Sequence, residues 1–125
     1  MKLILFGIGA LFVGTGAYMF VTPHLFYEGT PGVAMMGPFN THFIRDAGLA
    51  FLTSGGALVW GGLNHNRPVA VFGAVWPCLH AAFHIWIWFA RGMPFDQVAF
   101  VNLVGIQLPA WLALYAASKL DGART

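Results

Sequence analysis

The chain has 125 residues, of which 58% are hydrophobic and only 8% are charged. A soluble domain carries about 25% charged residues, so this composition excludes an ordinary soluble domain and indicates that lipid is the main solvent. The net charge of +2, with no cluster of basic residues, excludes nucleic acid as a partner. The single cysteine, Cys78, excludes an internal disulfide, and its apolar neighbours predict a role in core packing.

Four apolar runs each approach the ~20 residues that a bilayer core requires. We expect membrane-spanning helices at residues 3–21, 42–63, 68–90 and 97–118. The predicted fold is therefore all-α, an integral membrane four-helix bundle that forms a single domain over residues 1–125. Residues 22–40 contain several turn-forming glycine and proline pairs and are predicted to be a loop at the membrane interface.

Small residues in the first span recur at helical spacing, which predicts a stripe for close packing against another helix. These residues are Gly7, Ala10, Gly14 and Ala17. At the start of the second span, Asn40 or Thr41 is suited to cap the helix. In the third span, Pro77 is expected to produce a kink.

The distribution of Lys and Arg predicts the orientation in the membrane, because an even number of spans places both termini on one side. The terminal side holds Lys2, Arg67, Lys119 and Arg124. The other side holds Arg91, with Arg45 at the head of the second span. The positive-inside rule then places both termini in the cytoplasm, in a membrane of the bacterial cytoplasmic (inner) type.

An Arg-Asp pair, Arg45 and Asp46, lies at the edge of the second span. Ionisable groups at membrane depth are costly and are treated as candidates for a functional site, so each needs a partner. We expect the two residues to neutralise each other or to pair with neighbours. A simpler reading of Asp46 is that a negative charge near the first turn suits the helix dipole.

The polar residues of three spans are predicted to share the outer half of the membrane. From the rise per residue, Asp46 lies about 6 Å from the outer end of its helix, Asn102 about 8 Å, His84 about 9 Å and His80 about 15 Å. His42 and Asp46 are four residues apart, as are His80 and His84, so each pair shares a helix face. These four residues are the predicted pocket.

Four further residues are expected to support this pocket: Asn40, Arg45, Trp76 and Asn102. Asn102 and Gln107 are five residues apart, and on an α-helix they would not share a face. We therefore expect only one of them to join the pocket, and we favour Asn102.

Three kinds of chemistry fit such a pocket. Three imidazoles and a carboxylate suit a transition metal such as zinc, copper or iron. The same groups, with Trp76 as an aromatic wall, could hydrogen-bond a quinone carbonyl or a lipid head group. Alternatively, the polar residues form a network that only locks the helices together. The sequence does not decide whether the protein is an enzyme.

Two motifs resemble those of small bacterial four-helix membrane proteins of the DoxX-like group. They are the stretch from Pro38 to Gly48 (PFNTHFIRDAG) and the later stretch from His80 to His84 (HAAFH). The resemblance implies a four-span layout. Some relatives in that group are small subunits of quinone-linked oxidoreductases, which implies a redox setting. We therefore expect an accessory or small subunit that binds a metal or a redox ligand such as quinone, in contact with other membrane subunits or with further copies of itself.

Overall fold

The computed structural model describes residues 1–121, so Arg124, which was counted in the orientation argument, lies outside the described residues. Within residues 1–121 the chain is helical and contains no strand. Three helical segments are long and apolar enough to cross a membrane: α1 (Lys2–Val21), α4 (Arg67–Ala90) and the continuous segment Gln97–Ser118. The helix α3 (Thr41–Leu63) is equally long but is not among them. It carries an Arg-Asp pair and several Gly, Ser and Thr residues, which lower its hydropathy.

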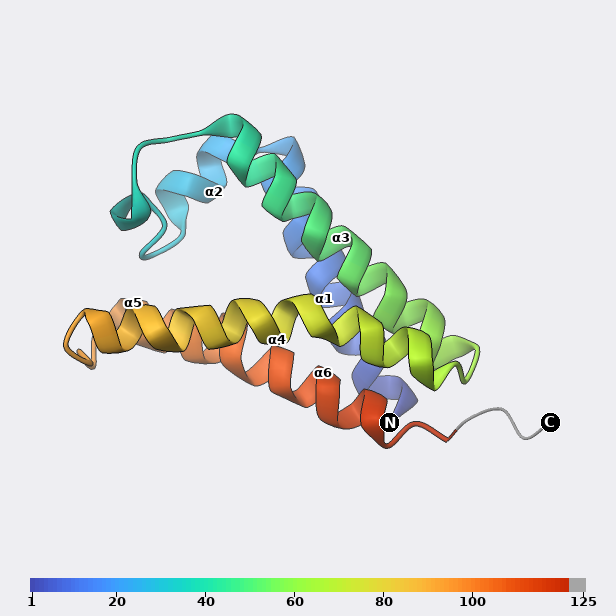
Figure 1. The fold of residues 1–125 in the computed structure, drawn as a ribbon. Helices are drawn as coiled ribbons and strands as arrows, with labels where there is room; N and C mark the ends of the chain where they lie inside the picture. The colour runs from blue at the N-terminus through green and yellow to red at the C-terminus, as the bar shows by residue number, and fades with distance from the viewer. Residues whose placement is uncertain (122–125) are drawn as a thin grey trace.

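Helices α1 and α3 run antiparallel and contact each other through glycines. Gly9 packs against Gly55 and Gly16 against Gly48, so that a Cβ atom added to Gly16 would lie 2.5 Å from the Gly48 carbonyl oxygen. Only a residue without a side chain permits this approach of the two backbones. The contact therefore places α3 directly alongside α1 (Figure 1).

The predicted packing stripe on α1 was wrong. Gly7 and Gly14 have no atom within 4 Å of an added Cβ, and Ala10 and Ala17 are exposed. The stripe that packs is formed by Gly9 and Gly16 instead. Small residues recur at helical spacing on two faces of this helix, so the spacing alone could not show which face meets α3.

The core between the helices is built largely from alanine. Ala70 and Ala74 of α4 pack with alanines of α6 (Leu108–Ser118) and with Leu5, Phe12 and Leu58. A second cluster contains Cys78, whose thiol donates to the Ala110 carbonyl oxygen at 3.3 Å. Cys78 is buried, which confirms its predicted role in the core.

The segment between α1 and α3 is more ordered than the predicted loop. It contains the short helix α2 (Pro23–Gly29) and the 3-10 turn η1 (Ala34–Met36). The Tyr27 hydroxyl donates to the Gly37 carbonyl oxygen at 2.8 Å, which ties the segment to itself. Gly32 contacts Val98 of α5 (Gln97–Asn102), so the segment reaches the start of the last long helical segment.

Helices α3 and α4 meet near the turn that joins them and diverge from it (Figure 1). Asn40 caps α3 by accepting the Phe43 amide N–H at 3.0 Å, which confirms one of the two predicted caps. Asn66 caps α4 in the same way through Val69. The divergence matters for the site, because it separates the N-terminal end of α3 from the C-terminal end of α4.

Candidate ligand-binding groove

The last predicted span is one helical segment with a π-helical turn in its middle. The turn η2 (Leu103–Gln107) lies between α5 and α6, and the Leu108 amide N–H donates to the Leu103 carbonyl oxygen, five residues back. Because a π-turn takes about five residues, residues five apart share a face there. Asn102 and Gln107 therefore lie together, with Gln107 Nε2 donating to Asn102 Oδ1 at 3.0 Å. The expectation that only one of them would join the site was wrong, because it assumed α-helical geometry.

The two amides form a network that links α4 to the last span. Gln107 Nε2 also donates to the Ala81 carbonyl oxygen at 2.8 Å, and Gln107 Oε1 accepts from Trp111 Nε1 at 3.0 Å. Asn102 Nδ2 lies 3.5 Å from both the Nδ1 atom and the carbonyl oxygen of His84. Hydrogen bonds of this kind are usually 2.9–3.0 Å long, so the Asn102 NH₂ group is held only weakly.

These amides border a groove between the C-terminal half of α4 and the start of the segment Gln97–Ser118, which we call the amide groove. Its volume is about 670 Å³, within the range of small-molecule sites. Most of its lining is apolar. The lining residues include Ile85, Trp88, Phe89, Phe95, Ala99, Phe100 and Leu103. Asn102, Gln107 and Asp96 are the polar side chains among the residues that line it.

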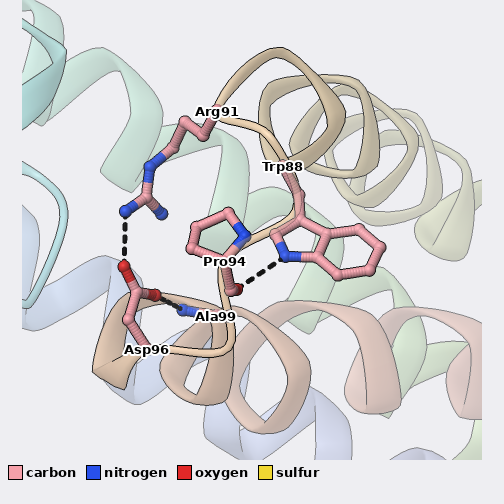
Figure 2. Close-up of polar contacts among 5 residues, drawn as sticks. All are labelled: Trp88, Arg91, Pro94, Asp96 and Ala99. Atoms are coloured by element: carbon pink, nitrogen blue, oxygen red, sulfur yellow. Dashed lines mark hydrogen bonds and ion pairs between the residues drawn. The ribbon is translucent and has the colours of Figure 1, made fainter.

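A short turn between α4 and α5 contributes Phe95 and Asp96 to the lining of the amide groove, and Figure 2 shows the polar contacts of this turn. Asp96 accepts the Ala99 amide N–H at 2.8 Å and pairs with the Arg91 guanidinium at 2.6 Å. Trp88 Nε1 donates to the Pro94 carbonyl oxygen at 2.9 Å. The backbone hydrogen bond from Ala99, followed by the contact with Arg91, lowers the pKa of Asp96 from its ordinary value of 3.8. The turn thus keeps a carboxylate and an indole at fixed positions on the rim.

Aromatic rings surround the two histidines of α4. The His80 ring stacks on Trp76 with centroids 5.0 Å apart and planes 9° apart, and it meets the edge of Phe51 of α3. The His80 and His84 rings lie 4.5 Å apart, as expected for residues on one helix face. Trp76 therefore packs against His80, and the His84 ring, which contacts both His80 and Asn102, connects this stack to the amide network.

The two predicted pairs do not form one site. His42 and Asp46 pair with each other at 3.2 Å on the exposed start of α3, and the His42 side chain is 90% exposed. Over residues 1–121, no three His, Cys, Asp or Glu side chains are grouped so that they could hold a metal ion. The divergence of α3 from α4 explains this, because matched depth does not bring residues together on helices that splay apart (Figure 1).

Arg45 and Asp46 also have separate partners. The Arg45 Nε atom donates to the Phe20 carbonyl oxygen at 3.1 Å, and its guanidinium carbon lies 5.6 Å from the Phe20 ring centroid. Adjacent residues on a helix point in different directions, so Asp46 pairs four residues back with His42 instead. Of the supporting residues, Asn40 serves as the α3 cap, and only Asn102 and Trp76 contact the histidines of α4.

Several residues of the amide groove were missed by the sequence analysis. Asp96 had a readable signal, because an Asp three residues before Ala99 and ahead of an apolar run is typical of a helix N-cap. Trp88 was not among the predicted site residues. Gln107 was set aside because the π-turn leaves no clear mark in the sequence beyond Pro109, which cannot donate a backbone hydrogen bond.

Comparisons with known proteins do not place the chain in a family. No family model, curated protein or solved structure matches it. The resemblance to the DoxX-like group therefore stays a prediction from two motifs. Function has to be inferred from the grooves and their polar contacts.

Proposed function

We propose that this chain is a small four-helix integral membrane protein that binds a quinone-type ligand in the amide groove, as an accessory subunit of a membrane complex. In this proposal both termini face the cytoplasm, and the groove lies in the outer half of the membrane. The observation that carries the proposal is a groove with apolar walls whose lining includes two side-chain amides, one of which contacts a histidine.

The position of α3 supports four spans instead of three. Its glycines contact those of α1 along the middle of both helices, at Gly9 with Gly55 and at Gly16 with Gly48. If α1 crosses the bilayer, α3 is held at the same depth beside it. Close contact between helices also shields backbone and polar groups of α3 from lipid, which offsets its lower hydropathy.

The chemistry of the amide groove suits a ring with a carbonyl group. The NH₂ group of Asn102 makes only two 3.5 Å contacts, both with His84, so it can donate to a ligand oxygen while Asn102 Oδ1 keeps its bond from Gln107. The aromatic and aliphatic walls suit a flat ring and an isoprenoid chain, and ligand sites of this kind combine apolar walls with a few polar groups. In this proposal His84 contacts Asn102 from behind the groove lining, of which His84 is not a part.

The geometry favours an organic ligand over a metal. His80 and His84 could supply two nitrogen ligands, but a structural or catalytic zinc site usually has at least three protein ligands. In the described part of the chain no third His, Cys, Asp or Glu completes such a set.

A structural role is the second candidate, and one observation favours it. Among residues 1–121, every fully enclosed side-chain nitrogen or oxygen has a hydrogen-bond partner. The donors of Gln107 are satisfied by Ala81 and Asn102 without any ligand. On this reading the network holds α4 against the last span and has no further role.

Quinone titration of the purified protein separates the two candidates. We expect decylubiquinone to quench tryptophan fluorescence saturably, because Trp88 lines the groove. Asn102→Leu should weaken quinone binding about tenfold, the effect of losing roughly 1.4 kcal/mol of hydrogen bonding. Asn64→Leu is the matched control. Asn64 caps the C-terminal end of α3, away from the amide groove, and its side chain donates only to the nearby Trp60 carbonyl oxygen.

The outcomes are distinct. Saturable quenching that Asn102→Leu weakens and Asn64→Leu preserves supports the binding role. If decylubiquinone does not bind saturably, or binds equally to both variants while Asn102→Leu lowers the melting temperature, the network is structural and the proposed function fails.

A further inference from the structure

A second groove lies between α3 and α4, away from the amide groove, and we call it the serine groove. Its volume is about 300 Å³, and its lining includes Ser54, Thr53, Gly73 and Trp76 together with apolar side chains such as Phe72 and Leu79. Neither the histidines nor the amide network line this groove.

Ser54 contributes a polar hydroxyl group to this largely apolar groove. The residue is only 6% exposed, yet its hydroxyl makes no hydrogen bond to any other group of residues 1–121. Every fully enclosed polar side-chain atom in this part of the chain does have a partner. The Ser54 hydroxyl is therefore not fully enclosed, and the groove that it lines is where it opens. A buried hydroxyl without a partner is costly, so this group is suited to a ligand.

Gly73 lines the same groove, and its carbonyl oxygen lacks the usual helical donor. In an α-helix its carbonyl oxygen would accept from the amide four residues later, but that residue is Pro77, which has no N–H. Gly73 lines the groove and packs closely against the Ser54 backbone, 3.1 Å from the position of an added Cβ. Ser54 and Gly73 thus line the same groove, whose other polar side chain is Thr53.

We propose that the serine groove binds the hydroxyl end of an apolar alcohol of the isoprenoid type. An alcohol both donates and accepts a hydrogen bond, which matches the Gly73 carbonyl and the Ser54 hydroxyl. The apolar lining takes the adjoining hydrocarbon chain, and Trp76 offers a flat surface to it. This site is independent of the amide groove and of its proposed quinone.

Farnesol and the hydrocarbon farnesene, which has the same carbon skeleton without the hydroxyl, test this site. We expect the protein in lipid nanodiscs to bind farnesol saturably and at least fivefold more tightly than farnesene. Ser54→Ala should weaken farnesol binding about fivefold and leave farnesene unchanged, as expected for one neutral hydrogen bond. Calorimetric titration gives the affinities.

Thr53 provides a control in the adjacent position. It lines the same groove, but its hydroxyl already donates to the Leu49 carbonyl oxygen at 2.9 Å. Thr53→Ala should therefore leave farnesol binding unchanged. Pro77→Ala is a second test, and it should not impair folding because alanine favours a helix. The new amide N–H would donate to the Gly73 carbonyl oxygen and occupy it, so this variant should also bind farnesol more weakly.

Three results would overturn the proposal. One is equal binding of farnesol and farnesene. Another is an equal loss in the Thr53 and Ser54 variants. The third is the absence of saturable farnesol binding to the unaltered protein, which would leave the Ser54 hydroxyl to a water molecule. Quinone binding is unaffected by any of these, so the two proposals fail separately.

Discussion

Two pairs of helices pack closely in this molecule, and they do so with different residues. One pair is α1 with α3, and the other is α4 with the segment Gln97–Ser118. In the first pair, glycines seven residues apart bring the two backbones into contact. In the second, alanines fill part of the interface, and the amides of Asn102 and Gln107 bridge the rest. Backbone contact leaves no space for a ligand, whereas bridging side chains leave a groove beside them. The first pair is therefore suited to stability and the second to binding.

The largest loss of stability is expected when a side chain is added at the glycine contact between α1 and α3. In Gly16→Ala the new Cβ would lie 2.5 Å from the Gly48 carbonyl oxygen, so the two backbones must separate. We expect a loss of about 3 kcal/mol, the upper part of the range for overpacking, because the atom in contact is backbone and cannot move alone. Thermal unfolding of the purified protein in detergent measures the loss.

Gly14→Ala is the matched control on the same helix. No atom lies within 4 Å of its added Cβ, so it should be neutral or stabilise the helix by up to about 1 kcal/mol. A similar loss in both variants would mean that α1 is sensitive to any added methyl group, and the assignment of the packing face to Gly9 and Gly16 would be wrong.

An intermediate loss of stability is expected from Gln107→Leu, in the second pair of helices. The change removes the bond to the Ala81 carbonyl oxygen and leaves Trp111 Nε1 without its acceptor. We expect a loss of about 2 kcal/mol in thermal unfolding, from lost hydrogen bonds and an unpaired donor. Gln97→Leu, at the exposed start of α5, is the control and should change little. If the two leucine variants are equally stable, the amide network does not hold these helices together.

The sequence predicts the ends of the helices much better than it predicts the site. The predicted span 97–118 matches the observed segment Gln97–Ser118, and each predicted end of the other three spans is within one residue of the observed end. This succeeds because hydropathy, caps and prolines are local signals. The site depends on the relative rotation and divergence of helices, which no local pattern records. The π-turn that joins Asn102 to Gln107 and the splay that separates Asp46 from His84 were both missed for that reason.

The smallest effect on stability is expected from titration of Asp96, in the short turn between α4 and α5. Its pKa is lowered in the folded protein by the Ala99 amide N–H and by Arg91, so its ionised form stabilises the fold above the ordinary carboxyl pKa. That stabilisation should be lost as the pH falls through the lowered pKa of the folded state. The melting temperature of the unaltered protein, measured from pH 6 to pH 3, should decline at the acidic end.

Asp96→Asn isolates this effect from the general effects of acid. Asparagine can still accept the Ala99 amide N–H as an N-cap, but it cannot titrate and does not pair ionically with Arg91. The variant should start with a slightly lower melting temperature and lose less of it on acidification, so that the two curves converge at low pH. Parallel curves over the whole range would mean that the Arg91–Asp96 pair contributes nothing to stability. The rim of the amide groove would then be held by the cap and by the bond from Trp88 to Pro94 alone.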